Sequence, residues 1–214
     1  MSLLQRLLAR RATRPAETPF APAGDGDGTH ASVDASVTSS QSRADEPLIE
    51  ATTIGDIVRV EEVSDAEFYA GELFRRRFRA DPPDFPRHFV PFYRQGRTTY
   101  RPVGYVHYTA FEDSWLCGGL VMDDRAYRRI PAPHRKLIKD AGGIAEIMLR
   151  ATFARLADAP AIWGYVGDKQ AEEVDLRAGF RRTHHRHVMV VWNRELSEEE
   201  KAARLARVIA LGPF

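Results

Sequence analysis

The sequence has few of the features that mark extracellular, membrane or nucleic-acid-binding proteins. It contains one cysteine, Cys117, in 214 residues, which excludes an internal disulfide framework and is typical of a reducing compartment. No apolar run reaches the roughly 18 residues that a membrane-spanning helix needs. The 31 lysines and arginines are balanced by 30 aspartates and glutamates, so no overall charge attracts nucleic acid. We therefore expect a cytoplasmic protein without a nucleic-acid partner, in which any anion-binding site is local.

The N-terminal quarter of the chain differs in composition from the remainder. In residues 1–14, leucines fall on one helical stripe and arginines occupy other positions. This pattern is typical of a helix that binds a membrane surface, a partner protein or a targeting receptor, although a frayed terminal helix has it too. The region from Pro15 to Thr52 has too few apolar side chains to offset the entropy cost of ordering. We predict a basic amphipathic segment plus a disordered linker over residues 1–52, and one folded domain over residues 53–214.

The folded part is predicted to begin with a strand and a helix. Ile57–Val60 alternates as a strand does, and Ser64 with Glu67 has the spacing of a capping box for a helix through Arg79. The block from Asp81 to Phe92 is rich in proline, which predicts a loop that wraps over the core.

Strands and helices alternate in the rest of the chain. A short polar connection at residues 112–114 predicts a hairpin, and Gly179 and Ser197 have the positions of a helix stop and a helix cap. Strands are predicted over Val103–Phe111, Trp115–Met122, Ile162–Val166, Arg181–His185 and His187–Asn193. Helices are predicted over Gly143–Asp158, over Lys169–Ala178 and after Ser197. The predicted fold class is therefore α/β.

Two adjacent glycines, Gly142 and Gly143, precede an apolar-periodic helix. Such a helix start can present free backbone N–H groups to an anion, because the amides point outward and the helix dipole adds positive charge. Alternatively, apolar residues recur across the glycines, so that Pro133–Ala157 forms one helix in which the glycines only permit close packing. Two glycines cost on the order of 2 kcal/mol in a helix interior, which favours a helix start.

The region around these glycines resembles the GNAT N-acyltransferases, which transfer an acyl group from coenzyme A to an amine. Gly143-Ile144-Ala145 fits the last half of the family's cofactor loop, Gln/Arg-x-x-Gly-x-Gly/Ala. The resemblance covers roughly Ile54 to Leu196 and implies a mixed, mostly antiparallel central sheet flanked by helices. Two further stretches resemble family motifs. Val121 to Arg128 resembles the end of a strand followed by Tyr-Arg. Val166, Ala171, Gly179 and Phe180 resemble the family's Val-x-x-Asn-x-x-Ala, which is followed by Gly-Phe. The chain departs from the family at three residues. Asp140 replaces the Gln/Arg of the cofactor loop, Asp168 replaces the Asn, and Asp175 replaces a Tyr that protonates the leaving thiolate. The chain also has an insertion from Arg129 to Ala141.

The resemblance also implies site residues. Amides at the glycines would bind the diphosphate of an acyl-CoA, basic side chains would add charge, and a gap between two strands would expose an N–H for the oxyanion. The candidate cofactor-binding residues are Leu120, Val121, Met122, Arg128, Arg129, Lys139, Gly142, Gly143, Ile144, Ala145 and Asp168. The candidate catalytic acids and bases are His107, Glu112, Asp123 and Asp175. The loop from Asp81 to Phe92 becomes a candidate lid over the acceptor.

Our leading hypothesis is an acyl-CoA-dependent N-acyltransferase, more narrowly an N-acetyltransferase, that uses direct transfer. Its co-substrate would be acetyl-CoA or another acyl-CoA, and its acceptor an amine-bearing small molecule or a protein N-terminus or lysine. The alternative is a catalytically silent module of the same fold that binds a nucleotide or a partner protein, docked through its N-terminal arm. The histidines between His184 and His187 lack a well-placed carboxylate or cysteine, so no metal site is predicted and they are interpreted as a solvated strand or the rim of the acceptor pocket.

Overall fold

The computed structural model describes residues 49–214. The predicted N-terminal helix and most of the predicted linker lie outside the described residues. The elements, in chain order, are η1 (Ile54–Asp56), β1 (Val58–Val63), α2 (Ala66–Phe78), β2 (Arg87–Arg94), β3 (Tyr100–Pro102), β4 (Gly104–Phe111), β5 (Ser114–Met122), α3 (Asp124–Arg128), α4 (Ala132–Asp140), α5 (Ile144–Arg155), β6 (Ala161–Tyr165), α6 (Lys169–Ala178), β7 (Arg181–Arg182), β8 (Val188–Trp192) and α7 (Glu198–Leu211).

The strands form one sheet in the order β1-β2-β4-β5-β6-β8-β7, and β3 also pairs with β2. Neighbouring strands run antiparallel except for β5 and β6, which are parallel. The predicted fold class, an α/β protein with a mixed, mostly antiparallel central sheet flanked by helices, is confirmed. Both predicted hairpins are present, at β4–β5 and β7–β8, although β7 and β8 are shorter than expected.

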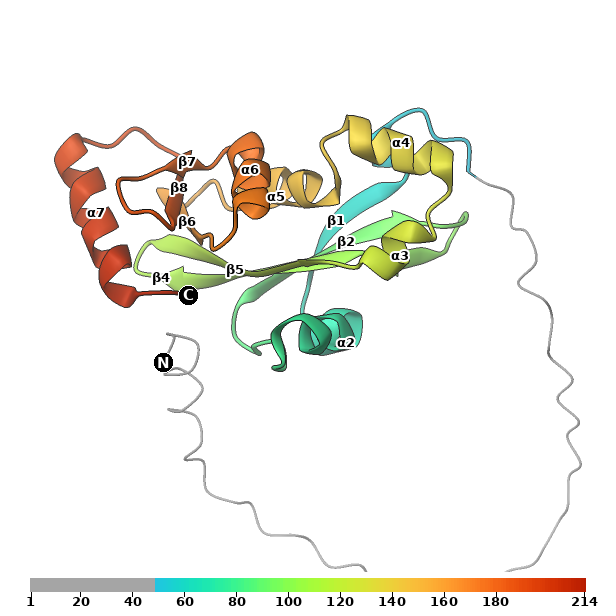
Figure 1. Ribbon diagram of the computed structural model, residues 1–214, viewed down its shortest axis with the longest axis horizontal. Coiled ribbons are helices and arrows are strands. Elements are labelled where there is room, and N and C mark those ends of the chain that lie inside the picture. Colours follow the sequence, from blue (N-terminus) through green and yellow to red (C-terminus); the bar gives the residue numbers. More distant parts are fainter. Residues whose placement is uncertain (1–48) are drawn as a thin grey trace, which may run out of the picture.

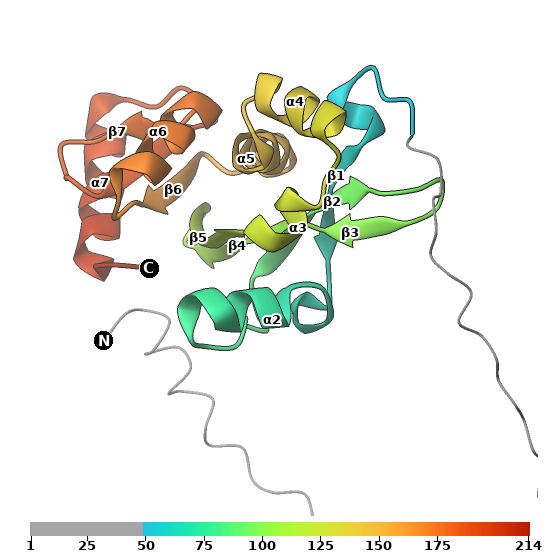
Figure 2. The same cartoon turned by 45° about the vertical axis from the view of Figure 1, so that its right-hand side comes forward.

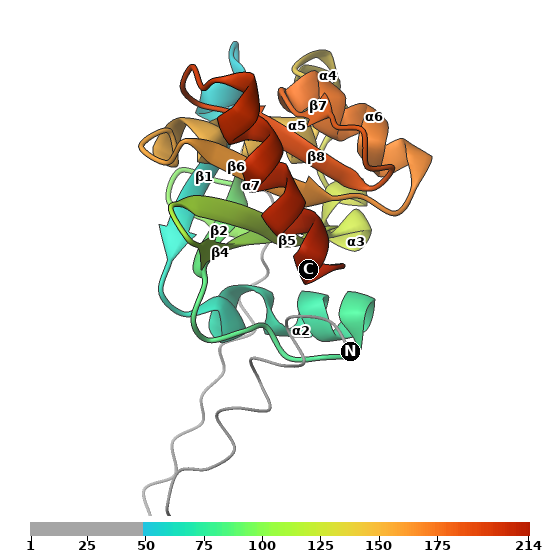
Figure 3. The ribbon, with the colours of Figure 1, turned by 90° about the vertical axis from the view of Figure 1, so that its left-hand side faces the viewer.

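Helices cover both faces of the sheet (Figures 1 and 2). On the face that we call the α5/α6 face, Met148 and Phe153 of α5 share a core cluster with Tyr108 of β4. On the opposite face, the α2 face, Phe74 of α2 shares a cluster with Tyr105, which lies three residues before Tyr108 on the same strand. The last helix, α7, runs across β6 and β8 (Figure 3). Side chains of β4 therefore alternate between two interiors, which places the candidate residue His107 on the opposite face from its neighbour Tyr108.

The proline-rich block is not a loop throughout, so the predicted loop and candidate lid are wrong over its second half. β2 occupies Arg87–Arg94 in the middle of the β1–β2–β4 pairing, and Phe89 and Val90 are fully buried. Pro91 lacks an N–H, but its carbonyl accepts from Val103 N at 2.9 Å, so the strand tolerates it. Burial of the neighbouring side chains outweighs the cost of the proline.

The helix after β1 begins slightly later than predicted. Its N-cap is Asp65, whose carboxylate accepts from Phe68 N at 2.8 Å, so the predicted capping box of Ser64 and Glu67 is wrong. The predicted helix cap at Ser197 is confirmed, and Ser197 and Glu200 form a capping box there. Gly179 ends α6 as predicted.

The predicted insertion, Arg129 to Ala141, folds into α4. α4 ends at Asp140 and α5 begins at Ile144, with Gly142 and Gly143 between them at φ values of +94° and +93°. L-residues rarely adopt this conformation, which explains both glycines. The alternative of one continuous helix across Pro133–Ala157 is therefore wrong.

Candidate functional site

The parallel strands β5 and β6 pair over only part of their length. The last paired residues are Cys117 and Gly164, and β5 continues to Met122 without a β6 partner among residues 49–214. At this point β5 also carries a bulge against β4, with Gly119 at φ +61°. We call the boundary between β5 and β6 beyond Cys117 the seam. The candidate residues Leu120, Val121 and Met122 lie along it, as the resemblance implied.

The glycines Gly142 and Gly143 create a helix start, but their own amides are occupied. Gly142 N donates to Lys139 O at 3.0 Å and Gly143 N donates to Ile138 O at 2.8 Å, which closes the end of α4. The first intrahelical bond of α5 is Ile147 N to Gly143 O at 3.1 Å. The amides of residues 144–146 therefore have no backbone partner in the described chain, and they replace Gly142 and Gly143 as the candidate anion donors.

A buried carboxylate lies against this helix start. The Glu146 side chain is 8% exposed and pairs with Arg150 at 2.8 Å and with Arg177 of α6 at 3.0 Å. Burial opposes its charge, but the two guanidinium groups outweigh burial and hold the pKa of Glu146 below its usual value. Arg150 and Arg177 are each more than half exposed, so they present positive charge near the amides of α5.

Asp175 lies in the interior between the sheet and α6, with 9% of its surface exposed. Burial, followed by repulsion from Asp168 and Glu172, raises the pKa of Asp175 to about 7. Burial and the nearby Asp175 in turn raise the pKa of the Cys117 thiol, so this partly buried side chain is protonated. Asp175 is thus a carboxyl group that is partly protonated near neutral pH, in electrostatic contact with the last paired residue of the seam.

His107 lies on the α2 face, away from Asp175. It is 4% exposed, its ring fills the space beside Gly118 and Gly119, and its Nδ1 atom has no hydrogen-bond partner among the described residues. Burial, and then the neighbouring His88, lower the pKa of His107 to about 3. A histidine in this environment is a poor proton acceptor at neutral pH.

The other two candidate bases have structural partners. Glu112 lies in the β4–β5 turn, at the opposite end of β5 from the seam, and pairs with Arg207 of α7 at 2.9 Å. Asp123 follows Met122 directly, caps α3 by accepting from Arg125 N and Ala126 N, and pairs with Arg76 at 3.2 Å. The fold therefore brings Asp123, but not Glu112, to the end of β5 that has no β6 partner.

The basic residues of the insertion divide between internal bonds and solvent. His134 bonds to Tyr93, Arg135 donates to backbone carbonyls, and Lys136 pairs with Asp140. Arg129 lines a groove of about 380 Å³ between α2 and α3 rather than the start of α5. Lys139, in the last turn of α4, remains next to Gly142.

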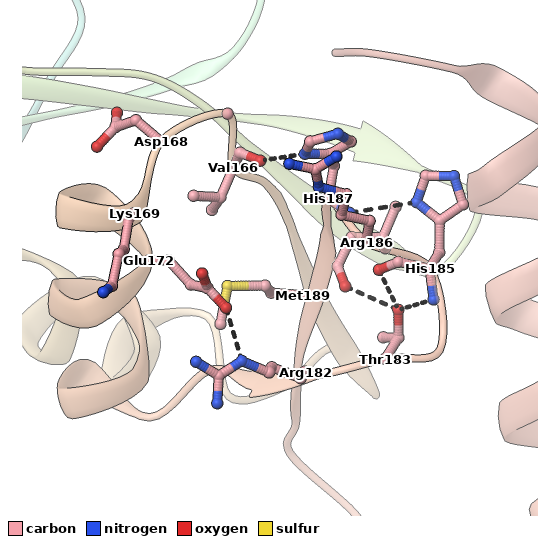
Figure 4. Close-up of a pocket in the computed structure, with 12 residues that line it drawn as sticks. Val166, Asp168, Lys169, Glu172, Arg182, Thr183, His185, Arg186, His187 and Met189 are labelled. Carbon is pink, nitrogen blue, oxygen red and sulfur yellow. Dashed lines mark hydrogen bonds and ion pairs between the residues drawn. The ribbon is translucent and has the colours of Figure 1, made fainter.

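A second cavity, of about 450 Å³, lies between the start of α6 and the β7–β8 connection (Figure 4). The candidate residue Asp168 lies on its wall and caps α6 by accepting from Ala171 N at 2.8 Å. His185 and His187 also line it, in agreement with their interpretation as a pocket rim. The basic residues Lys169, Arg182 and Arg186 join them, which sequence reasoning missed because only the fold brings α6 next to this connection.

No group of three or more His, Cys, Asp or Glu side chains in residues 49–214 is placed to hold a metal ion. No helix in the same range has both the length and the apolar character to cross a membrane.

No protein-family model and no curated protein matches the chain. Several solved structures are similar in fold. The ribosomal-protein-S18-alanine N-acetyltransferase from Escherichia coli has 11% identity and a TM-score of 0.45, over 66% of this chain and 97% of that one. An acetyltransferase of the GNAT family from Staphylococcus aureus Mu50 has 11% identity and a TM-score of 0.40, over 64% and 99%.

A mutant of the AtaT toxin bound to the C-terminus of the antitoxin AtaR has 14% identity and a TM-score of 0.36, over 71% of this chain and 98% of that one. At identities of this size a comparison extends to the fold alone. The mixed sheet, the seam between its parallel strands and the helix start after Gly143 are all present in the chain itself. This architecture is the one that the resemblance to the GNAT N-acyltransferases implied.

Proposed function

We propose that this chain is an acyl-CoA-dependent N-acyltransferase that moves an acyl group from the CoA thioester directly to an amine. The observation that supports this most is the position of Asp175. A buried carboxyl group with a pKa of about 7 lies beside the seam, on the same face of the sheet as the free amides of α5. One face of the sheet thus offers both an anion-binding helix start and a proton donor.

The start of α5 fits the diphosphate of an acyl-CoA. A Cβ built on Gly143 meets no atom within 4 Å, so open space lies beside the amides of residues 144–146. Helix N-termini bind phosphates through such amides, and Arg150, Arg177 and Lys139 add charge-assisted contacts. In this proposal the glycines form the tight turn that exposes the next three amides.

Asp175 supplies the proton that the reaction requires. The amine nitrogen attacks the thioester carbonyl, a tetrahedral oxyanion forms, and its collapse breaks the C–S bond and releases the CoA thiolate. A protonated Asp175 transfers its proton to that sulfur, the role that the resemblance gives to a tyrosine. An acid with a pKa near the working pH is well suited to this step.

The residues that stabilise the oxyanion and accept the amine proton lie at the end of β5 that has no β6 partner. A main-chain N–H within Leu120–Met122 stabilises the oxyanion, and Asp123 accepts the proton that the amine loses. Asp123 is retained as the base because it follows Met122 directly at the end of β5 that has no β6 partner, whereas His107 is buried beneath α2.

Glu146 favours a second candidate function, a catalytically silent module of the same fold. Its buried carboxylate lies next to Gly142, where it reduces the positive charge available to a phosphate. A module of this kind would bind a partner protein, with residues 1–14 as its arm, and would show no affinity for acyl-CoA.

Acyl-CoA binding separates the two candidates. A ligand at 100 times its dissociation constant stabilises the folded state by about 2.7 kcal/mol, which thermal melting detects. We expect acetyl-CoA or a longer acyl-CoA to raise the melting temperature. If acetyl-CoA, longer acyl-CoAs and free CoA all leave it unchanged, the enzyme proposal is wrong.

The position of the site is tested by a matched pair of variants at Ala145. Ala145→Glu adds a carboxylate to the first turn of α5, which suits the helix dipole but repels a phosphate. Ala145→Gln has the same size without the charge. We expect Ala145→Glu to weaken acyl-CoA binding at least tenfold more than Ala145→Gln in isothermal titration calorimetry. Equal affinities for the two variants would place the diphosphate elsewhere.

A further inference from the structure

The cavity at the start of α6 carries uncompensated positive charge. Of its two carboxylates, Asp168 caps the helix and Glu172 pairs with Arg182 at 2.6 Å. Lys169 and Arg186 form no ion pair with any described residue, and both line the cavity. Figure 4 shows the cavity between α6 on one side and the β7–β8 connection on the other. A ligand here meets two free cations, and the nearest acids are already engaged.

Hydrogen bonds hold the wall opposite α6 in place. Thr183 Oγ1 donates to Val188 O at 2.7 Å and accepts from His185 N at 3.1 Å. His187 Nδ1 donates to Val166 O at 2.9 Å, and its ring stacks on Tyr165 with centroids 5.4 Å apart. In the neutral form of His187 the ring proton is therefore on Nδ1, and Nε2 can accept a hydrogen bond from a ligand.

The cavity is adjacent to the proposed catalytic acid. Asp168, Glu172 and Asp175 have the i, i+4, i+7 spacing of one helix face, and the first two line the cavity. Glu172 and Asp175 are roughly 4.5 Å apart along the axis of α6. A small molecule in the cavity can therefore place its other end near Asp175.

We infer that this cavity binds the acceptor, and that Lys169 and Arg186 select amines that also carry a phosphate or a carboxylate group. The inference rests on the proposed function and names its substrate class. The 3′-phosphate of CoA has the same chemistry, but the proposed diphosphate site contacts Arg177, at the other end of α6 from Lys169. These two positions are roughly 12 Å apart along the helix axis.

The first test uses inorganic phosphate as the probe. In an NMR titration of the wild-type protein, the ring signals of His185 and His187 shift on addition of phosphate. Lys169→Ala/Arg186→Ala removes the shift, whereas Arg77→Ala/Arg181→Ala keeps it. The control pair loses the same charge at exposed positions outside the cavity. Absence of a phosphate-dependent shift in the wild type, with acyl-CoA binding intact, overturns the inference and leaves the proposed function standing.

The second test distinguishes the two sources of phosphate. With saturating CoA present, the phosphate titration is repeated and compared with saturating dephospho-CoA. Unchanged phosphate binding in both supports an acceptor site. Displacement of phosphate by CoA but not by dephospho-CoA assigns the cavity to the 3′-phosphate and overturns the inference.

The third test measures specificity with paired acceptors, phosphoethanolamine against ethanolamine and glycine against methylamine. We expect Lys169→Ala/Arg186→Ala to raise KM at least tenfold for the anionic member of a pair, with kcat unchanged and no effect on the neutral member. An equal change for both members of each pair contradicts a role in selecting anions.

Discussion

On the α2 face of the sheet, buried polar side chains are packed against one another and against α2. His88 Nδ1 bonds to Tyr105 Oη at 2.7 Å, and His107 lies against Phe74 and the bulge of β5. On the α5/α6 face, Asp175 is buried beside the seam, and the amides at the start of α5 face open space. Burial lowers the pKa of His107 to about 3 and raises the pKa of Asp175 to about 7, so near neutral pH His107 is neutral and Asp175 is partly protonated.

The two faces also differ in the space beside their glycine pairs. The glycine pair Gly118–Gly119 is filled by the His107 ring, which would touch a Cβ at either position. At the second pair, the Glu146 carboxylate would meet a Cβ at Gly142, whereas Gly143 has no neighbour in its Cβ position. Both pairs therefore accommodate a side chain, and the second also leaves open space at one of its glycines. An acid on the face that keeps this space can serve catalysis, whereas a neutral base under a closed surface serves packing.

The largest expected effect is the loss of the proton donor. Asp175→Asn keeps a neutral group of the same size, so the fold is preserved, but it removes the transferable proton. We expect kcat to fall about 10³-fold, equivalent to about 4 kcal/mol. The wild-type rate should decline above pH 7 as Asp175 ionises, and the residual rate of the variant should lack that decline. Glu173→Gln, at an exposed position of the same helix, is the control. Wild-type kcat in Asp175→Asn would transfer the proton-donor role to another group.

The sequence indicated the position of Asp175 but could not establish that it acts as a proton donor. Its spacing from Gly179 gave its position, whereas its pKa depends on burial and on Asp168 and Glu172, which act through the folded helix. Most elements after Val103 were predictable because local signals, such as the stop at Gly179 and the cap at Ser197, agree with the tertiary packing, whereas α3 and α4 were not predicted.

Elsewhere local signals conflicted with packing. The prolines around β2 indicate a loop, but burial of Phe89 and Val90 determines the outcome. The amides of Gly142 and Gly143 could not be known to be occupied, because their acceptors belong to α4, within an insertion that has no counterpart in the family pattern. Proton acceptance by His107 was plausible from its type, and only the packing of α2 excludes it.

A smaller effect is expected where the closed face is overfilled. Gly119→Ala places a Cβ 2.5 Å from the His107 ring, at a backbone φ of +61° that alanine disfavours. We expect a loss of about 3 kcal/mol in the free energy of unfolding, measured by urea denaturation. Gly167→Ala, with no atom within 4 Å of its added Cβ, should stay within about 0.5 kcal/mol of wild type. His107→Ala should recover part of the loss in the Gly119→Ala background, and strict additivity of the two changes would refute the packing explanation.

A gradual effect, of at most about 1.4 kcal/mol for each pH unit, is a dependence of stability on pH that has opposite signs for His107 and Asp175. The folded pKa of His107, about 3, is below the unfolded value of about 6.5, so its contribution is complete above pH 6.5 and is lost as pH falls toward 3. The folded pKa of Asp175, about 7, is above the unfolded value of about 3.9, so its contribution is complete below pH 4 and is lost as pH rises through 7.

Two variants separate these contributions in urea denaturation across pH 4–8. His107→Gln should flatten the loss of stability between pH 6 and pH 4, because glutamine takes up no proton when the chain unfolds. Asp175→Asn should leave that acid limb unchanged and gain stability relative to wild type between pH 5 and pH 8, because it removes an ionising carboxyl group from the interior. If Asp175→Asn shows no such gain, the carboxyl group is solvated in the folded state. The contrast between the two faces would then fail, together with the assignment of Asp175 as a neutral acid.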